Sequence, residues 1–327
     1  MLKIGIMSGA SIVPRFVEGI KESGVAQAAA IATRRLEKAQ QLATELGIPK
    51  AYGSYEALLA DNEVELIYIP LINHLHFSAA KAAIQAKKHV LLEKPFTLHS
   101  EEAQELYALA QQHDVFLMEA QKAVFLPAIE DVKKTIDSGK IGQVQLVDIR
   151  DARPGSEKIP WFWDMEKGGG VLISNASYPL SVSQYFFGTG FDGYNGICVE
   201  HGSGQTDEQC MINLKQKDLL ISLFLTTKMS FTSTYSIIGE KGTIIIPNYW
   251  KTDHYTIQMN DGEVVKKDFP MNSEFVFEIR HVVDLLSSGK KQGTVVDPNM
   301  TITNVQVVDD LYYKWFGDAW RKGSSDK

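Results

Sequence analysis

Short apolar runs and helical patterns alternate over the first 120 residues. The apolar runs suit buried strands and lie at Leu2–Met7, Ala28–Ala32, Leu66–Ile69, His89–Glu93 and Val115–Glu119. One helical pattern runs from Leu36 to Leu46 and ends at Gly47, a residue typical of helix C-termini. Further helices are expected from Phe77 to Ala86 and from about Ser100. This alternation predicts an α/β fold with a doubly wound parallel sheet.

After about residue 120, extended segments cluster instead of alternating with helices. They are expected at Val144–Arg150, Gly196–Glu200, Cys210–Leu214, Leu219–Thr226, Phe231–Ile238 and Thr243–Ile246. Helices are expected at Pro127–Ser138, Ser174–Phe187, Glu274–Ser288 and Asn299–Phe316. The pattern predicts an α+β domain with a largely antiparallel open sheet. We therefore expect two domains, residues 1–120 and 121–327.

Composition narrows the class of partner. The 327 residues include 44% hydrophobic residues and carry a formal net charge of −7, with basic residues only in scattered pairs. This balance argues against nucleic acid or an anionic membrane as partner. The two cysteines do not suggest a disulfide framework, so a reducing cytoplasm is expected. We see no signal peptide, membrane span or zinc-ligand spacing, and no metal is predicted.

The first strand leads into a turn at the position where dinucleotide-binding folds place Gly-x-Gly-x-x-Gly. Ser8, Ala10 and Val13 occupy the three glycine positions. Small residues at 8 and 10 still allow a close turn, and amides at the following helix start can hold a pyrophosphate. We assign cofactor binding to Ser8, Gly9, Ala10, Ser11 and Ile12. An ordinary strand–helix turn would also fit these residues.

The second strand ends at Ala32-Thr33-Arg34-Arg35, with no acidic residue before Glu37. An NAD site places an acid here for the ribose 2′-hydroxyl, whereas arginine accommodates the 2′-phosphate of NADP. Thr33 and Arg34 are therefore the expected NADP contacts. The other interpretation is that both arginines are solvated at a helix start.

A lysine stands directly after the apolar run His89–Leu92, in Glu93-Lys94-Pro95. Pro95 cannot continue the strand. Ligands of open α/β sheets bind beyond the carboxyl ends of the strands, so Lys94 is placed to meet a substrate. A solvated loop lysine is the other interpretation.

Several segments together resemble the glucose–fructose oxidoreductase/inositol dehydrogenase (Gfo/Idh/MocA) family, nearest the branch of dimeric dihydrodiol dehydrogenase and glucose–fructose oxidoreductase. The matching segments are Gly5–Val13, Ile48–Tyr55, Glu93–Pro95, Phe116–Ala120, Gly168–Leu172 and Tyr178-Pro179. The resemblance covers nearly the whole chain. It implies an N-terminal NAD(P)-binding Rossmann domain and a C-terminal domain for substrate binding and oligomerisation.

The resemblance also assigns residues. Lys94 matches the family's lysine beside the nicotinamide and substrate, and Tyr178 matches the tyrosine used as proton donor in this branch. Many relatives instead use an aspartate and a histidine four residues apart, and here Ser174 and Tyr178 stand at those places. The family's Thr-Pro-Asn-x-x-His segment appears as Leu71–His76. It implies Leu71, Asn73, His76 and Glu93 as further cofactor neighbours.

Tyr178 and Lys94 suggest a mechanism for carbonyl reduction, in which Tyr178 is the general acid. A free tyrosine has a pKa near ~10, and a neighbouring ammonium lowers it. Lys94 would tune Tyr178 and bind a substrate hydroxyl. Trp161 and Phe162, with Trp163 beside them, could line a sugar or aromatic pocket, or could belong to the core or a subunit contact.

The sequence thus predicts an NADP(H)-dependent oxidoreductase, with NAD(H) also possible, acting on a small sugar, polyol or dihydrodiol. A dinucleotide-sensing regulatory protein and an enzyme of redox-assisted glycoside cleavage are the alternatives. The open sheet of the second domain would pack against a second copy, giving a homodimer or higher homo-oligomer.

Overall fold

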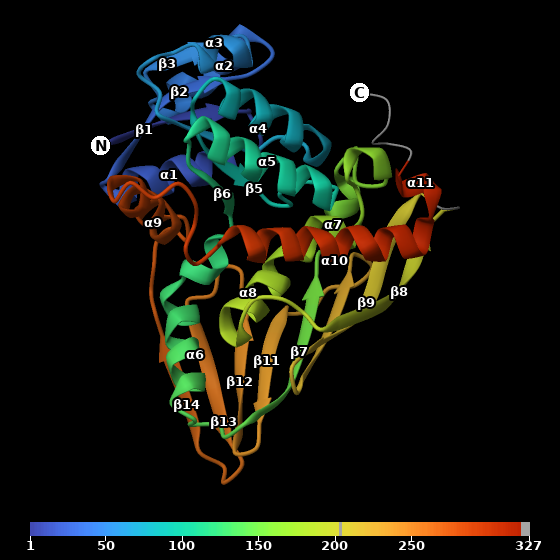
Figure 1. Ribbon diagram of the computed structural model, residues 1–327. Coiled ribbons are helices and arrows are strands. Elements are labelled where there is room, and N and C mark those ends of the chain that lie inside the picture. The colour runs from blue at the N-terminus through green and yellow to red at the C-terminus, as the bar shows by residue number, and fades with distance from the viewer. Residues whose placement is uncertain (203–204, 322–327) are drawn as a thin grey trace. The chain divides into compact units, whose positions relative to one another are not determined.

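The computed structural model describes residues 1–202 and 205–321, so residues 322–327 of the expected second domain lie outside it. The chain forms two compact units (Figure 1). The first comprises Met1–Lys122 and Asn272–Thr301, and the second comprises Ala123–Met271 and Ile302–Lys327.

The first unit is built on a six-stranded sheet of order β3-β2-β1-β4-β5-β6. Its strands are β1 (Leu2–Met7), β2 (Ala26–Ala32), β3 (Lys50–Tyr52), β4 (Leu66–Ile69), β5 (His89–Glu93) and β6 (Leu117–Ala120). Its helices are α1 (Val13–Ser23), α2 (Leu36–Leu46), α3 (Tyr55–Leu59), α4 (His76–Gln85), α5 (Ser100–His113) and α9 (Val276–Ser287). All neighbouring strands pair in parallel, which confirms the predicted Rossmann-type sheet.

Apolar residues on both faces explain why these strands form a parallel sheet. Every residue of β4 is buried, and in β5 only the two end residues are partly accessible. Gly47 ends α2 with φ +69°, a left-handed conformation that costs glycine little, and its N–H donates to the Ala43 carbonyl. The C-terminal cap expected at Gly47 is therefore present.

Residues 272–301 pack with the first unit, whereas the expected division placed them in the second domain. The reason is an apolar contact made by residues far apart in the sequence. The Phe275 ring meets Phe16 of α1 edge to face, with ring centroids 5.6 Å apart. Gly19 of α1 leaves room for it, because a Cβ there would collide with the Phe275 side chain.

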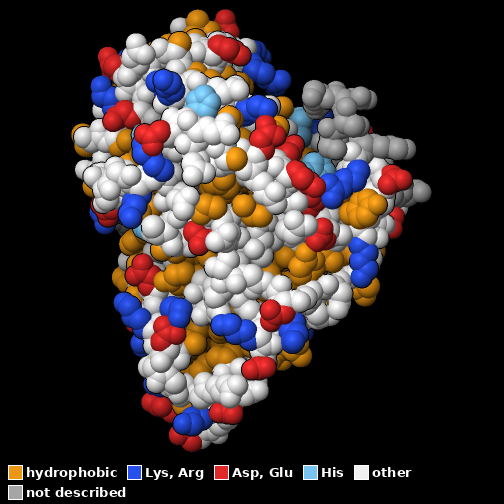
Figure 2. Space-filling model, in the orientation of Figure 1, with side chains coloured by type: hydrophobic (Ala, Val, Ile, Leu, Met, Phe, Trp, Pro, Cys, Tyr) orange, Lys and Arg blue, Asp and Glu red, His pale blue; other side chains and the backbone are white. Residues whose placement is uncertain are grey.

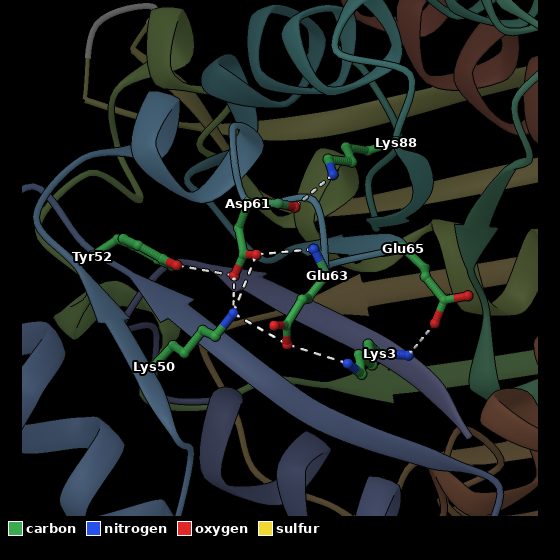
Figure 3. A network of polar contacts seen from close by, with 7 residues as sticks. All are labelled: Lys3, Lys50, Tyr52, Asp61, Glu63, Glu65 and Lys88. Carbon is green, nitrogen blue, oxygen red and sulfur yellow. Dashed lines mark hydrogen bonds and ion pairs between the residues drawn. The ribbon is translucent and has the colours of Figure 1, made fainter.

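Polar contacts fix the edge strand β3, which the sequence pattern did not predict (Figure 3). Asp61 accepts hydrogen bonds from Lys50 Nζ at 3.0 Å, Tyr52 Oη at 2.9 Å and the Glu63 amide at 2.9 Å. Lys88 Nζ donates to the Asp61 carbonyl at 2.7 Å. Burial alone would raise the pKa of Asp61, but its hydrogen-bond donors outweigh burial and lower that pKa.

The second unit contains an eight-stranded sheet of order β14-β13-β12-β11-β7-β10-β9-β8. Its strands are β7 (Val144–Ala152), β8 (Gly193–His201), β9 (Thr206–Gln216), β10 (Leu219–Thr226), β11 (Thr234–Gly239), β12 (Gly242–Pro247), β13 (His254–Met259) and β14 (Val264–Asp268). β7 and β10 run parallel and the other neighbours pair antiparallel, as predicted. The hairpin β13–β14 was not predicted from the sequence.

Helices cover one face of this second sheet. They include α6 (Pro127–Asp137), α7 (Val171–Asn175), α8 (Ser177–Phe187), α10 (Pro298–Phe316) and α11 (Asp318–Arg321). Tyr255 of β13 bonds Thr135 of α6, and Tyr235 of β11 bonds Ser183 of α8. The single helix expected over Ser174–Phe187 is instead two helices that meet at Ala176. Pro179 accounts for the break, since it lacks an amide hydrogen and its ring would clash with the Asn175 carbonyl.

On the face shown in Figure 2, acidic and basic side chains are intermixed and no large patch carries one sign of charge. Within residues 1–202 and 205–321, no helix combines the length and apolar character that crossing a bilayer requires.

Candidate active site

The turn between β1 and α1 lies at the carboxyl edge of the first sheet and holds the five residues expected to bind a dinucleotide. Ser8 is buried, and its Oγ accepts a hydrogen bond from the Ala10 amide at 3.0 Å. The Val13 amide donates to the Ala10 carbonyl at 3.0 Å. Ser11 is exposed, and Ile12 precedes the first residue of α1. The turn is therefore compact, although other residues occupy all three of the usual glycine positions.

Gly9 explains how a lysine reaches this turn. A Cβ at Gly9 would lie 3.0 Å from Cε of Lys38 and 3.3 Å from its Nζ. Lys38 is the third residue of α2, and its ammonium lies beside the backbone at Gly9. The sequence analysis missed this residue. Its signal in the sequence was a basic residue in the first turn of the helix that follows Arg34-Arg35.

Thr33 and Arg34 stand at the end of β2, beside this turn. Thr33 is buried, and its hydroxyl donates to the Arg35 carbonyl at 2.7 Å, which fixes the start of α2. Arg34 is exposed, and its charge acts on the pKa of Tyr55. Burial raises that pKa and the guanidinium opposes the rise, so Arg34 lies close to Tyr55.

An apolar pocket of about 230 Å³ opens at the carboxyl ends of β1 and β4. Its lining includes Met7, Tyr55, Leu59, Leu71, Leu75 and Ala79. Pockets that enclose a drug-sized ligand measure roughly 300–1,000 Å³, so this one suits a single ring of a larger ligand. Leu71 thus lines this pocket, and so does Tyr55, which was not among the site residues predicted from the sequence.

His76 and Asn73 are buried after β4. His76 Nδ1 lies 2.7 Å from the Pro95 carbonyl oxygen, and Nε2 lies 3.1 Å from that of Leu71. Burial lowers the pKa of His76 to about 4, so the ring is neutral and has one proton to donate. His76 therefore contacts both the loop after β4 and the loop that carries Lys94, and its one proton is donated to one of the two carbonyls.

Glu93 is the last residue of β5, and Lys94 follows it. Glu93 accepts a hydrogen bond from Tyr68 Oη at 2.6 Å through one oxygen and from the Lys94 amide at 3.1 Å through the other. Tyr68 is fully buried and stacks on Phe16, with ring centroids 3.6 Å apart. The backbone at Lys94 is thus fixed from both sides, by Glu93 and through the Pro95 carbonyl.

Tyr178 lies in the second unit, as the second residue of α8, and is 8% exposed. The preceding loop, Gly168–Gly170, leads into α7 and is held by buried polar contacts. Asp207 Oδ2 accepts from the Leu172 amide at 3.0 Å, and Tyr312 Oη donates to the other oxygen. Gly170 has φ +107°, and a Cβ there would collide with Tyr312 and Asp207. Only glycine fits at this position.

The aromatic run Trp161–Trp163 also belongs to the second unit. Phe162 is 1% exposed, and its carbonyl accepts from the Gly170 amide at 2.7 Å. Trp163 stacks on His201 with ring centroids 3.7 Å apart, and Trp161 is half-buried. Of the three, Trp161 and Trp163 keep accessible surface. Within the described part of the chain, no group of three or more acidic, histidine or cysteine residues could hold a metal ion.

Two family models match the chain. A model described as an oxidoreductase family with an NAD-binding Rossmann fold matches residues 2–121, and a GFO/IDH/MocA C-terminal domain model matches residues 129–245. The chain belongs to the Gfo/Idh/MocA oxidoreductase family. The resemblance inferred from the sequence is therefore confirmed.

Relatives within the Gfo/Idh/MocA family place the chain near the dihydrodiol dehydrogenases. It is 30% identical over 327 residues to the trans-1,2-dihydrobenzene-1,2-diol dehydrogenase of Xenopus tropicalis, which covers 94% of this chain and 95% of the relative. It is 40% identical to an uncharacterised oxidoreductase of Synechocystis sp. over 67% of this chain and 64% of that protein. The chain is thus an NAD(P)-dependent oxidoreductase acting on CH–OH groups.

A solved structure shares the fold over almost the whole chain. KijD10, a 3-ketoreductase from Actinomadura kijaniata solved with NADP and TDP-benzene, has a TM-score of 0.86 and 22% sequence identity. The match covers 95% of this chain and 96% of KijD10.

Proposed function

We propose that this protein is an NADP(H)-dependent oxidoreductase that interconverts a hydroxyl and a carbonyl group on a small dihydrodiol, sugar or polyol. A dihydrodiol is the preferred candidate substrate, because the similar protein of Xenopus tropicalis is a trans-1,2-dihydrobenzene-1,2-diol dehydrogenase. The observation that carries the proposal is that the predicted binding residues lie at one edge of the first sheet. The turn between β1 and α1, the apolar pocket and Lys94 all lie at the carboxyl ends of strands of the first sheet, where open α/β sheets bind ligands.

The residues of this edge fit a dinucleotide. The apolar pocket beside Tyr55 would take the adenine ring, and the amides at the start of α1 would hold the pyrophosphate. Arg34 and Lys38 would hold a 2′-phosphate, with Thr33 beside them. NADP(H) is therefore the preferred cofactor and NAD(H) is possible. Asn73, His76 and Glu93 would support the nicotinamide side of the site.

Lys94 and Tyr178 would perform the proton chemistry. The cofactor, when bound, supplies or accepts the hydride. In the reducing direction Tyr178 donates its hydroxyl proton to the carbonyl oxygen, and in the oxidising direction tyrosinate accepts the proton of the hydroxyl. The Lys94 ammonium favours tyrosinate and hydrogen-bonds the same substrate oxygen. Trp161 and Phe162 are proposed to lie beside the substrate.

The test is turnover of NADP⁺ with trans-1,2-dihydrobenzene-1,2-diol and a panel of polyols and sugars. We expect turnover by the native chain, and a loss of roughly 10²–10⁴-fold in kcat for Tyr178→Phe. Tyr185→Phe is the matched control, because Tyr185 lies on the same helix and is half-buried. Tight NADPH binding without turnover of any substrate would instead support a regulatory, dinucleotide-sensing protein.

We further propose a cytoplasmic homodimer formed through the outer face of the second sheet. Ile197 and Val199 of β8 and Leu220 of β10, the two strands that flank β9, expose 74%, 47% and 59% of their surface. Covering this apolar face with a second copy would remove it from water. Cys198 and Cys210 face each other across β8 and β9 as free thiols, which suits a reducing compartment.

A further inference from the structure

An arginine stands beside a buried carboxylate at the carboxyl end of β7, in the second unit. Asp151 is 0% exposed, and its Oδ2 accepts a hydrogen bond from Arg153 Nη2 at 2.8 Å. The same oxygen accepts from Tyr249 Oη at 2.8 Å, and Oδ1 accepts from Ser233 Oγ at 2.9 Å. A buried carboxylate is costly unless it is paired and hydrogen-bonded, and these donors meet both needs. Asp151 thus fixes one side of the Arg153 guanidinium.

The ring of Trp250 fixes the guanidinium from a second direction. Cζ of Arg153 lies 3.5 Å from the centroid of this ring. A guanidinium that stacks on an aromatic face keeps its plane in one orientation. Trp250 in turn contacts Tyr249, with ring centroids 5.4 Å apart. Arg153 is therefore held in place by the protein itself, so little conformational freedom is lost when a ligand binds to it.

Arg153 has more hydrogen-bond donors than the protein satisfies. A guanidinium carries N–H donors on all three of its nitrogens, and Asp151 accepts from Nη2. Nε is buried and has no hydrogen-bond acceptor among the described residues. The side chain keeps 19% of its surface exposed, so a ligand can reach the guanidinium. A buried donor without an acceptor is unfavourable, and a bound oxyanion would supply the acceptor.

Arg153 lies on the face of the second sheet that the helices cover. Side chains alternate between the two faces of a strand, and the buried residues Ile149 and Asp151 of β7 share one face. Arg153 continues this series directly after the end of the strand. Ile149 pairs with Tyr235 of β11, whose hydroxyl lies 2.8 Å from Ser183 Oγ of α8. Arg153 is therefore on the side of the sheet that carries α8.

Tyr178 lies at the same end of this sheet. The last residues of β7 and β10 pair with each other, and β9 begins beside them. Asp207, the second residue of β9, accepts a hydrogen bond from the Leu172 amide of α7 at 3.0 Å, so the start of α7 lies over this end (Figure 1). Tyr178 comes between Leu172 and Ser183 along α7 and α8. It therefore shares with Arg153 both the end and the face of the second sheet.

We propose that Arg153 is the specificity-determining residue of the substrate site, and that the substrate carries a carboxylate or phosphate group that binds the Arg153 guanidinium. The inference rests on the proposed function and names the substrate class of the same site. The reacting hydroxyl belongs to a sugar, polyol or dihydrodiol that bears this anion. Arginine suits this task because its planar guanidinium stays charged and binds either oxyanion through paired N–H donors.

The experiment compares matched neutral and anionic compounds with NADP⁺, using trans-1,2-dihydrobenzene-1,2-diol as the neutral reference. Glucuronate has a carboxylate where glucose has a hydroxymethyl group, and myo-inositol monophosphate has a phosphate where myo-inositol has a hydroxyl. We measure kcat/KM, or the inhibition constant against oxidation of the diol for a compound that is not turned over. We expect the native chain to favour the anionic member of at least one pair by roughly tenfold or more. The pair that shows this preference distinguishes a carboxylate from a phosphate.

Variants of Arg153 test whether this residue causes the preference. Arg153→Met should weaken use of the favoured anionic compound about 10–100-fold and change that of its neutral partner less than about threefold. Arg153→Lys keeps the charge without the stacked plane, so it should recover part of the loss. Removing Arg153 leaves Asp151 without its cation, so Asp151→Asn/Arg153→Met is the second variant if the single one does not fold. Lys266→Met is the control, because Lys266 forms an exposed ion pair with Asp268.

An anionic preference that Arg153→Met abolishes and Lys266→Met retains supports the proposal. Equal values within both pairs for the native chain, or equal losses for neutral and anionic partners in Arg153→Met, overturn it and leave Arg153 as the counterion of Asp151. Native turnover of the neutral diol then leaves the proposed function standing. If the native chain turns over no compound, the proposed function fails, and calorimetry with glucuronate and myo-inositol monophosphate decides the anion site. Weaker binding to Arg153→Met than to the native chain supports the site, and equal or absent binding overturns it.

Discussion

The two halves of the first sheet's carboxyl edge hold their cations in opposite ways. On the side of β1 and β2, Arg34 is exposed and Lys38 lies over the open turn at Gly9. On the side of β5 and β6, Lys122 is buried, with its ammonium 3.8 Å from Glu274 Oε1, and Glu278 of α9 is fully buried. An exposed cation keeps its charge when an anion binds to it and when the anion leaves. Enclosed cations respond strongly to every neighbouring charge, because low dielectric strengthens each interaction.

This difference assigns different tasks to the two halves. The exposed half suits recognition of a charged group that comes and goes, such as a phosphate. The enclosed half suits control of a reacting group, because low dielectric makes the charge of each group depend on its neighbours. Substitutions in each half should therefore affect different measurable quantities.

The largest effect is expected at the enclosed end, from Lys94→Met. In the proposed mechanism, removing the ammonium takes away the positive charge that favours tyrosinate and a hydrogen bond to substrate. We expect kcat to fall roughly 10²–10⁴-fold, with NADPH affinity changed by less than about threefold. Steady-state kinetics and fluorescence titration measure the two quantities. An equal loss of cofactor affinity would mean that Lys94 serves cofactor binding instead of chemistry.

The exposed half should show the reverse pattern. The double variant Arg34→Ala/Lys38→Met should weaken NADPH binding about 10–100-fold and leave NADH binding unchanged, because two hydrogen bonds to a phosphate are lost and each contributes roughly 0.5–1.5 kcal/mol at an exposed site. Titration of both cofactors in the same salt measures this. Lys21→Met is the control, since Lys21 lies in the last turn of α1, away from the turn at Gly9. Equal weakening of NADH would contradict a role in 2′-phosphate recognition.

The pH dependence of the free energy of unfolding tests the buried charges of Lys122 and Glu278 without any substrate. Burial raises the pKa of Glu278 from an ordinary 4.5 to about 8 in the folded protein. Between these pH values the folded state binds more protons than the unfolded state, so stability falls as pH rises. Lys122 has a folded pKa of about 7 against 10.5, so between these values the unfolded state binds more protons and stability rises with pH. Each slope is at most about 1.4 kcal/mol per pH unit.

Urea unfolding between pH 5 and pH 10 measures both slopes. Glu278→Gln should flatten the fall below about pH 8, and Lys122→Met should flatten the rise above about pH 7. Glu105→Gln is the control, because Glu105 forms an exposed ion pair with Lys81, and it should leave both slopes unchanged. If Glu278→Gln or Lys122→Met left its slope unchanged, the replaced side chain would have the same pKa in the folded and unfolded states.

The smallest effect is expected away from the cofactor edge, at the network of Asp61 (Figure 3). Asp61→Asn removes the carboxylate that accepts from Lys50 and Tyr52 but keeps the shape of the side chain. We expect a loss of about 1–2 kcal/mol in the free energy of unfolding and no change in cofactor affinity. A change in NADPH affinity would show that β3 is coupled to the cofactor edge.

Elements with strong apolar patterns were predictable from the sequence. β1, β4 and β5 lie within the bounds expected from their apolar runs, and Gly47 ends α2 as expected. β3 was missed because three residues give no periodicity and Asp61 holds them by polar contacts. β14 was missed because Val264–Asp268 is mostly exposed and carries two lysines. The hydrophobic pattern reports burial, so strands that are held by polar contacts or lie at the surface are hard to predict from it.

The candidate site divides in the same way. The turn, Arg34 and Lys94 follow strands directly, so the rule for carboxyl ends of strands locates them. Lys38 and Tyr55 required knowledge of how α2 and α3 face the turn. Arg153 and Trp250 are far apart in the sequence, and only the pairing of β7 with β11 and of β11 with β12 brings them together.

The central claim is an NADP(H)-dependent oxidoreductase whose proton chemistry depends on Tyr178. It is tested most directly by turnover of NADP⁺ and NAD⁺ with trans-1,2-dihydrobenzene-1,2-diol and the polyol and sugar panel, for the native chain, Tyr178→Phe and Tyr185→Phe. We predict turnover with preference for NADP⁺, loss of it in Tyr178→Phe, and near-native rates in Tyr185→Phe. Native turnover that persists in Tyr178→Phe would contradict the role of this tyrosine, and binding of NADPH without any turnover would contradict the enzymatic function.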